Sequence, residues 1–312
     1  MKRSAALAFG AAAIGALAGR SAAQSTTTLH VAVPPSEDAA AVHFADAMGF
    51  FAKAGLSADI ASMQNNPAIA AAVASGAVDI GHGAVDTLAA SHAKGIPLVV
   101  IAPSGEYVSP SMQHIDGIFV PLNSAARSAK DLNGKVMAVA GLHGLQATAS
   151  CAWIDKNGGD SSTVKFVEVP FSGMAVALAQ ARVDAAFCTE PFIDDARKAG
   201  RALGYGLDAI GKHFLIAAWY TTRSWAAANP DLVRRFVAVM HETNLWANRN
   251  DAKSEEIIAT YTKIDPAVLA KMTRGHYAEQ FTPSLMQPLI DAAARYNGFA
   301  TFPAQELMQA SG

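Results

Sequence analysis

Apolar and polar positions follow two periods along the chain, and their alternation predicts short strands separated by helices. Leu29 to Val33 is an apolar run of strand length that ends before Pro34-Pro35-Ser36. Asp38 to Lys53 has helical spacing and ends at Gly55. The alternation continues with strand-like runs at 57–63, 78–80 and 97–102 and with helical stretches at 67–75 and 84–94. Strands joined by helices of this length favour right-handed crossovers and a parallel sheet.

The same order of elements then occurs a second time. Strand-like runs at 136–140, 164–169 and 183–188 alternate with helical stretches that end near 158 and 181. The joint between helix and strand reads SGAVDI at 75–80 and QARVDA at 180–185, at corresponding places in the two halves. The sequence therefore predicts two similar α/β lobes that follow one another.

Two segments are predicted to connect these lobes. Ser104 to Ser124 is rich in Ser, Pro and Gly around an apolar stretch, and His213 to Thr222 is a strand-like run after the second lobe. Two crossings place both termini in the first lobe and form a hinge. Capping residues followed by Pro predict three later helix starts, which are expected on the first lobe: Asn229-Pro230, Asp265-Pro266 and Thr282-Pro283.

The predicted fold class is therefore α/β, with two Rossmann-like lobes joined by a hinge and with C-terminal helices on the first lobe. The predicted boundaries are 1–23 for a signal peptide, 24–117 for the first part of lobe one, 118–214 for lobe two, and 215–312 for the return strand and the C-terminal helices. A chain of this length is ample for a core in each lobe.

The first residues have the pattern of a secretory signal peptide. Lys2 and Arg3 form a basic start, Ala5 to Ala18 is an uncharged and mostly apolar run, and Ser21-Ala22-Ala23 resembles a cleavage site. The apolar run is shorter than the roughly 20 residues that cross a bilayer. The alternatives are a retained anchor and a cytosolic N-terminal helix. We expect cleavage near Ala23 and a mature protein in the periplasm.

Composition argues against several other classes of protein. The 312 residues carry a net charge of −2, only 16% of them are charged, and no basic stripe stands out, so nucleic-acid binding has little support. Cys151 and Cys188 are too few for a disulfide scaffold, and we expect two free thiols, with a single bridge as the alternative. No Cys/His spacing resembles a zinc site, and no cofactor is predicted.

Five segments taken together resemble one family. They are GFFAKAGLSADI (49–60), SGAVDIGHG (75–83), DLNGKVMAV (131–139), ARVDAAFCTEPF (181–192) and NPDLVRRFVAVM (229–240). In this order they are similar to the type II periplasmic solute-binding proteins of ABC transporters, in the nitrate/sulfonate/taurine branch, which also holds binders of thiamine pyrimidine precursors. The resemblance covers nearly all of the mature chain. It implies a monomer that captures a small-molecule ligand in an interlobe cleft and delivers it to a membrane permease without catalysis.

The candidate site residues lie where predicted strands pass into helices. Ligands of open α/β sheets bind beyond the carboxyl ends of the strands, and helix N-termini there suit anionic groups. The predicted ligand-binding set is Ser36, Asp38, Asn66, His82 and Gly83 in the first lobe, Leu142, His143, Gly144, Ser172, Thr189 and Glu190 in the second, and Trp219 in the return crossing. Ordinary strand-to-helix turns need the same Gly and capping residues, so each position has a structural alternative.

Some of these residues have a more specific alternative. His82 and His143 either hydrogen-bond the ligand or have a purely structural role. Glu190 either enters the cleft or starts a helix with Pro191 at its first position. Trp219 either stacks on a flat ligand or packs in the core.

The nature of the ligand and the role of the protein have alternatives as well. No Arg or Lys stands in the predicted strand-tip clusters, and Asp38 and Glu190 favour a polar neutral or amine-bearing ligand. Both an organic sulfonate or carboxylate and a heterocycle stay open. A receptor that signals to a membrane kinase would share this fold. A fungal pyrimidine synthase is also similar to this branch, but it carries a Cys-rich motif that this sequence lacks.

Overall fold

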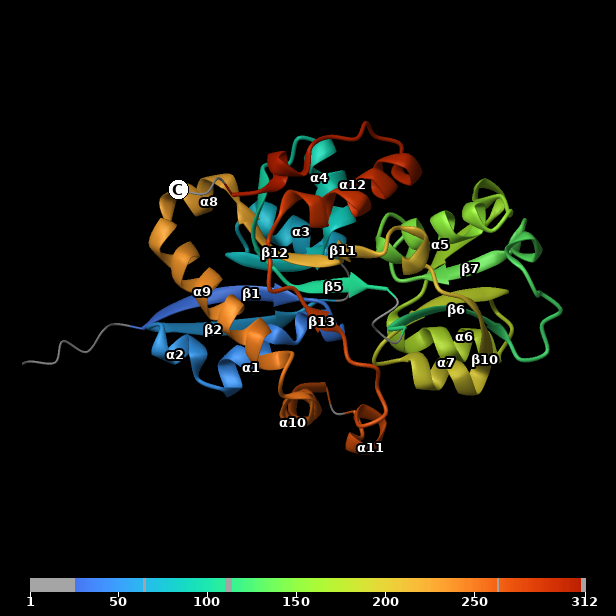
Figure 1. Ribbon diagram of the computed structural model, residues 1–312, viewed down its shortest axis with the longest axis horizontal. Coiled ribbons are helices and arrows are strands. Elements are labelled where there is room, and N and C mark those ends of the chain that lie inside the picture. The colour runs from blue at the N-terminus through green and yellow to red at the C-terminus, as the bar shows by residue number, and fades with distance from the viewer. Residues whose placement is uncertain (1–25, 64–65, 110–113, 263, 310–312) are drawn as a thin grey trace, which may run out of the picture.

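Two five-stranded sheets lie side by side, and helices cover both faces of each (Figure 1). The computed structural model describes residues 26–63, 66–109, 114–262 and 264–309. The predicted signal peptide, residues 1–23, lies outside them. We call the sheet that contains β1 (Thr27–Val33) and its helices the first lobe, and the other sheet and its helices the second lobe. The predicted two-lobed α/β fold is confirmed.

The sheet of the first lobe is mixed. Its strands lie in the order β2 (Leu56–Ser62), β1, β3 (Ile80–Ala84), β12 (Ala217–Thr222) and β4 (Leu98–Pro103). β1 runs parallel to β2 and β3, whereas β12 runs antiparallel to β3 and β4. The four strands that the sequence predicted to be joined by helices therefore run parallel to one another, and the return strand β12 enters between β3 and β4 in the opposite direction.

Side chains of this sheet alternate between two cores, as the period of a strand requires. Leu29, Val31 and Val33 pack against the cluster that contains α1 (Ala41–Ala47), α2 (Phe50–Lys53) and α9 (Pro230–Ala247). Ala32 packs in the opposite cluster, with α3 (Asn66–Ser75) and α4 (Val85–Ala93). Side chains in the middle of this sheet are therefore enclosed by helices on either face.

The strand β3 differs from its predicted range. The sequence pattern placed a strand at 78–80, but β3 spans Ile80–Ala84 and includes the segment Gly81-His82-Gly83. A Cβ atom on Gly81 would lie 2.7 Å from the Tyr220 ring and 2.8 Å from Val73 Cγ2. Packing therefore requires glycine here, and the low strand propensity of glycine hid the strand in the sequence.

The sheet of the second lobe is mixed in the same way. Its strands lie in the order β10 (Gly200–Gly204), β6 (Asp116–Pro121), β9 (Ala185–Thr189), β7 (Val136–Val139) and β8 (Lys165–Glu168). β7 runs parallel to β8 and β9, and β6 runs antiparallel to β9 and β10. One face packs on α5 (Leu145–Lys156), and the other packs on α6 (Met174–Ala179) and α7 (Ile193–Ala199). Because β6 is antiparallel to β9, the start of β6 lies beside the end of β9, where the candidate site is found.

A small antiparallel sheet lies between the lobes (Figure 1). Its strands lie in the order β11 (His213–Leu215), β5 (Gly105–Val108) and β13 (His276–Tyr277). β5 and β11 fall within the two predicted crossings, whereas β13 was not predicted. The first crossing, Ser104 to Ser124, therefore contains two strands, β5 and β6.

The C-terminal part of the chain is mainly helical. It contains α8 (Arg223–Ala228), α9, α10 (Asp251–Thr262), α11 (Pro266–Leu269) and α12 (Pro283–Asn297). The three predicted starts are confirmed, because Asn229, Asp265 and Thr282 each occupy the N-cap before a Pro. α9 packs on α1 of the first lobe, but α12 contacts both α4 and α5. The predicted placement on the first lobe therefore holds for α9, while α12 bridges the two lobes.

Short 3-10 helices join the remaining elements. They are η1 (Glu37–Ala39), η2 (Ala129–Leu132), η3 (Ser161–Thr163), η4 (Phe171–Gly173), η5 (Leu207–Ala209) and η6 (Ala304–Leu307). Cys151 and Cys188 are both free thiols. Among the described residues, no helix has the length and apolar character needed to cross a membrane.

Candidate functional site

A cleft between the lobes is lined by the carboxyl ends of strands from both large sheets. The first lobe contributes the segment after β1, the start of α3 and the end of β3, with Pro34, Asn66 and Ala84 among the lining residues. The second lobe contributes the segments after β7, β8 and β9, with Gly141, Phe171 and Glu190 among them. The small sheet adds residues of β5 and β13. Open α/β sheets bind their ligands at this position.

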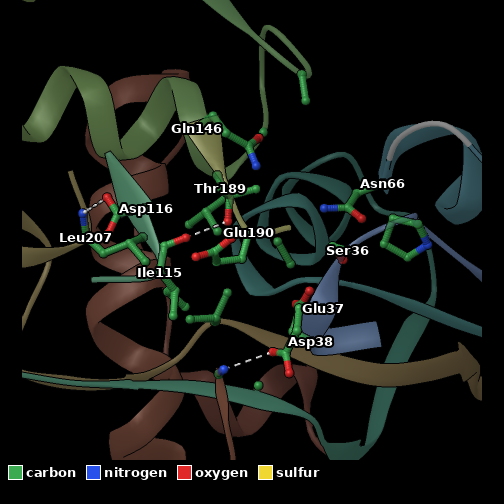
Figure 2. A pocket seen from close by; sticks show the side chains of 18 of the residues that line it. Ser36, Glu37, Asp38, Asn66, Ile115, Asp116, Gln146, Thr189, Glu190 and Leu207 are labelled. Carbon is green, nitrogen blue, oxygen red and sulfur yellow. Dashed lines mark hydrogen bonds between the residues drawn. The ribbon is translucent and has the colours of Figure 1, made fainter. Parts of the chain in front are cut away.

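Six of the twelve predicted ligand-binding residues line this cleft. They are Ser36, Asp38, Asn66, Gly144, Thr189 and Glu190. In the view of Figure 2, Asp116 and Asn66 lie on opposite sides and Glu190 lies between them. The structure therefore brings half of the predicted set together, and contact of these six residues with a ligand stays a prediction.

His82, Gly83 and Trp219 lie inside the first sheet and do not line the cleft. His82 and Trp219 are both 0% exposed, because β3 and β12 are inner strands with helices on either face. His82 Nε2 lies 3.0 Å from Ser104 Oγ, and the His82 and Trp219 ring centroids are 4.8 Å apart. A Cβ atom on Gly83 would lie 3.2 Å from the Tyr220 ring. The structural alternative therefore describes His82, and the packing alternative describes Trp219. The prediction of direct ligand contact is corrected for all three residues.

Leu142, His143 and Ser172 also lie outside the cleft. Leu142 is 42% exposed, and its N–H group donates to Glu168 Oε1 at 3.1 Å. His143 is exposed as well, and Ser172 lines a neighbouring hollow beside Phe192. These residues were predicted because each follows a strand. The sequence did not specify which residues of each turn face the opposite lobe.

The second lobe places a buried carboxyl group in the cleft that the sequence prediction missed. Asp116 begins β6 and lies opposite Thr189 of β9 in the antiparallel register. It is 1% exposed, and its Oδ2 atom accepts the N–H groups of Gly206 at 2.8 Å and Leu207 at 3.2 Å. Within the described chain its Oδ1 atom has no hydrogen-bond partner. Burial raises the pKa of Asp116 to about 7, against the effect of the two backbone donors.

Glu190 forms a contact between the lobes. Its Oε1 atom accepts the N–H group of Thr273, which follows α11, at 3.0 Å. Its own N–H group and the Thr189 hydroxyl both donate to the carbonyl of Ile115, at 3.1 and 3.0 Å. Burial raises the pKa of Glu190 to about 7. Because α7 begins only at Ile193, Glu190 does not start a helix, and the cleft alternative from the sequence analysis describes its position.

In the first lobe, a buried ion pair fixes the segment that carries Asp38. Arg274 donates to Glu37 Oε1 from Nη2 at 2.8 Å and from Nε at 3.1 Å. The Gly275 N–H group donates to Glu37 Oε2 at 3.1 Å, and the Tyr277 hydroxyl donates to the Glu37 carbonyl at 2.8 Å. Burial of the Glu37 carboxyl raises its pKa, and the Arg274 guanidinium acts in the opposite direction. The pair therefore anchors η1 beside the cleft.

Asp38 itself has no charged partner that neutralises it. Its Oδ2 atom lies 3.9 Å from His82 Nε2, but burial lowers the pKa of His82, so that ring is neutral near pH 7. The Ser104 hydroxyl donates to the Asp38 carbonyl at 2.8 Å. A Cβ atom on Gly105 would lie only 2.6 Å from Asp38 Cβ, so glycine allows this close approach. Asn66, nearby in the lining, has no partner for its Oδ1 atom within the described residues.

Glu106 on the small sheet binds two histidines and was also missed. Its carboxylate lies 2.9 Å from His213 Nε2 and 2.7 Å from His276 Nδ1, so it joins all three strands of that sheet. Burial raises the pKa of Glu106, but the two histidine hydrogen bonds outweigh burial and leave that pKa below its ordinary value. The hydrogen bond to Glu106 raises the pKa of His276.

The lining of the cleft is acidic. Among the described residues it contains no Lys or Arg and five carboxyl groups, those of Glu37, Asp38, Glu106, Asp116 and Glu190. Arg274 pairs with Glu37. His213 and His276 pair with Glu106. In the described parts of the chain, no group of three or more His, Cys, Asp and Glu side chains is placed to hold a metal ion.

The sequence also matches a known protein family. A family model described as NMT1/THI5 like matches residues 36–253, which is more than half of the chain. The chain belongs to this family. Among curated proteins, none matches the chain.

Several solved structures with the same fold are described as binding proteins. The ligand-binding component of an ABC-type import system from Staphylococcus aureus, solved with zinc bound, is 14% identical, with a TM-score of 0.76 over 91% of this chain and 96% of its own. The periplasmic aliphatic sulphonate binding protein SsuA from Escherichia coli is 16% identical, with a TM-score of 0.72 over 91% and 92%. The periplasmic nitrate-binding protein NrtA from Synechocystis PCC 6803 is 16% identical, with a TM-score of 0.66 over 91% and 75%. The predicted resemblance to the nitrate/sulfonate/taurine branch is confirmed at the level of fold.

Proposed function

We propose that the protein is the solute-binding component of an ABC-type import system. It captures a small organic solute in the interlobe cleft and delivers it to a membrane permease, as a monomer in the periplasm. The family match and the fold shared with binding components of import systems support this proposal. The predicted lobes, 24–117 with 215–312 and 118–214, are proposed with one change. The second lobe begins at Asp116, because β6 belongs to its sheet.

The cleft is the observation that carries this proposal. It is lined from both lobes. Each lobe has a hydrophobic cluster of its own on one face of its sheet, and the opposite faces belong to one cluster that contains residues of both lobes. Chain segments cross between the lobes through the small sheet, and Glu190 of the second lobe accepts a hydrogen bond from Thr273 on the other side. A solute held by groups from both lobes binds the closed arrangement better, and so it shifts the population towards closure.

We expect the protein to close when it binds its solute. Native mass spectrometry of protein purified without denaturation should show a small molecule bound to one chain. Small-angle scattering of that sample should give a smaller radius of gyration than protein stripped of the molecule by unfolding and refolding. Equal radii with the small molecule demonstrably bound would reject closure and indicate a rigid site.

The proposed function does not include catalysis. The two cysteines do not line the cleft, and Cys188 is 1% exposed. Burial raises the pKa of Cys151 to about 11 and that of Cys188 to about 12. Because the thiolate is the nucleophilic form of cysteine, neither residue supports covalent catalysis on a bound solute.

Export is the second testable part of the proposal. The basic start at Lys2 and Arg3, the apolar run and the small residues before Gln24 motivate it. We expect N-terminal sequencing of periplasmic protein from a bacterial host to begin at Gln24. Recovery of the intact chain in the cytosolic fraction alone would contradict export.

A further inference from the structure

Three carboxyl groups in the cleft form no ion pair with a Lys or Arg in the described part of the chain. Asp116 and Glu190 form no ion pair with any described residue, and the only ionisable partner of Asp38 is the buried, neutral His82. The other two carboxyl groups of the lining, those of Glu37 and Glu106, already have Arg274 and histidine partners. The cleft therefore contains more negative charge than ion pairs among the described residues offset, although Arg197, which pairs with Asp194, acts on Glu190 without forming an ion pair with it.

Two of these carboxyl groups come from adjoining ends of the paired strands β6 and β9. Asp116 lies opposite Thr189 in the register of β6 and β9, and Glu190 is the next residue of the chain after Thr189. Both side chains are almost fully buried, at 1% and 4% exposed. Burying carboxylates without a partner is costly, and burial raises the pKa of both groups to about 7. A positive charge in the cleft would reduce this cost.

Asp116 also has a free acceptor. Its Oδ2 atom is occupied by the N–H groups of Gly206 and Leu207, but its Oδ1 atom is buried in the cleft lining without a partner among the described residues. Native structures leave few buried polar atoms unpaired, and an exception calls for an explanation. A ligand N–H group that donates to Oδ1 would complete this site.

We infer that the solute is a small organic cation whose protonated nitrogen contacts the Asp116 and Glu190 carboxylates and faces Asp38 across the cleft. This inference rests on the proposed binding function and specifies the chemical class of its ligand. The aromatic and aliphatic side chains that also line the cleft, among them Phe171, Phe187 and Ile115, are suited to contact the carbon skeleton.

An anionic ligand is the competing class. The N-terminus of α5 begins at Leu145 in the lining, and free N–H groups at a helix N-terminus suit anions. An anion placed there would share the cleft with three carboxylates that form no ion pair with a described Lys or Arg, and it would meet no Lys or Arg among the lining residues that the structure describes. The charge balance of the cleft therefore favours the cation.

Thermal unfolding with matched probes tests the class of ligand. The probes are three carbon skeletons, each carrying an ammonium, a hydroxyl or a sulfonate group: ethylamine, ethanol and ethanesulfonate; butylamine, butanol and butanesulfonate; benzylamine, benzyl alcohol and phenylmethanesulfonate. Nitrate is added because a similar fold binds it. At equal millimolar concentrations near pH 8, at least one amine should raise the midpoint of unfolding of ligand-free protein, and its alcohol and sulfonate counterparts should not.

The same experiment separates this inference from the proposed function. Stabilisation by sulfonates or nitrate would overturn the cationic class and leave the binding function standing. Absence of stabilisation by every probe would overturn the cationic class and count against the binding function as well.

Variants locate the charge contact. Glu190→Gln keeps an oxygen for the Thr273 N–H group, and Asp116→Asn keeps one for Gly206 and Leu207. Each should weaken binding of the stabilising amine at least tenfold in calorimetry, since a hydrogen bond to a charged group is lost. Glu242→Gln on α9 is the matched control, because Glu242 is exposed and lies outside the cleft lining. Unchanged affinity in Glu190→Gln would overturn the assignment even if Asp116→Asn failed to fold.

Discussion

Replacing Arg274 by methionine is expected to lower the free energy of unfolding by about 3–5 kcal/mol, the usual cost of removing one partner of a buried ion pair. The Arg274 and Glu37 side chains are only 12% and 6% exposed. Arg274→Met leaves the Glu37 carboxylate with the Gly275 N–H group and the Tyr277 hydroxyl as its remaining donors. It also removes the hydrogen bond from Arg274 Nη1 to Ser254 Oγ at 2.7 Å. Urea unfolding near pH 7 measures the loss.

Two further variants show whether burial causes this effect. Arg234 pairs with Asp231 on the surface of α9 and is 75% exposed, so Arg234→Met should cost less than about 1 kcal/mol. The double variant Glu37→Leu/Arg274→Met removes both charges, so it should be more stable than Arg274→Met alone. If the double variant is no more stable than Arg274→Met, the unpaired charge of Glu37 is not the cause of the decrease in the free energy of unfolding.

The sequence was sufficient to predict the cleft residues whose position depends only on the local succession of strands and helices. Strands that pass into helices could be found from apolar periodicity, and the carboxyl ends of such strands meet at one edge of a sheet. Ser36, Asn66 and Gly144 were identified in this way, and all three line the cleft. The same reasoning could not exclude His82, because its burial depends on β12, a strand that lies more than a hundred residues later in the chain.

The residues that were missed depend on pairing between distant segments. Asp116 enters the site because β6 runs antiparallel to β9, and nothing in the sequence near 116 specifies that partner. Glu106 lies 2.7 Å from His276 only because the two-residue strand β13 joins β5. A strand of two residues has no periodicity to detect. The sequence did show that Arg and Lys are absent from the predicted strand ends. It could not show how many carboxyl groups the cleft contains, because Asp116 and Glu106 reach it through these long-range contacts.

Asp86→Asn is expected to change how stability depends on pH. Asp86 is completely buried in the first turn of α4, and its carboxyl accepts the Thr87 N–H group at 2.7 Å and the Thr148 hydroxyl of α5 at 3.3 Å. Burial raises the pKa of Asp86 to about 7, although these hydrogen bonds act against the shift. In the unfolded chain an aspartate titrates near pH 4.

The sign of the effect follows from proton binding. Between about pH 4 and pH 7 the folded protein holds a proton on Asp86 that the unfolded chain has lost, so the contribution of Asp86 to stability decreases as pH rises through this range. From pH 8 to pH 5.5, the stability of the unmodified protein relative to Asp86→Asn should therefore rise by about 2 kcal/mol. Comparison with the variant cancels the opposite contributions of His43 and His82, since burial lowers the pKa of both.

Urea unfolding of both ligand-free proteins at pH 5.5 and pH 8 measures this difference. Asp46→Asn serves as the control, because Asp46 is exposed on α1 and its replacement should give the same difference at both pH values. Thr148 belongs to the second lobe and Asp86 to the first, so the pKa of Asp86 depends on contact between α4 and α5. A difference that does not vary with pH would mean that Asp86 is hydrated, and therefore that α4 and α5 separate when the cleft of the ligand-free protein is open.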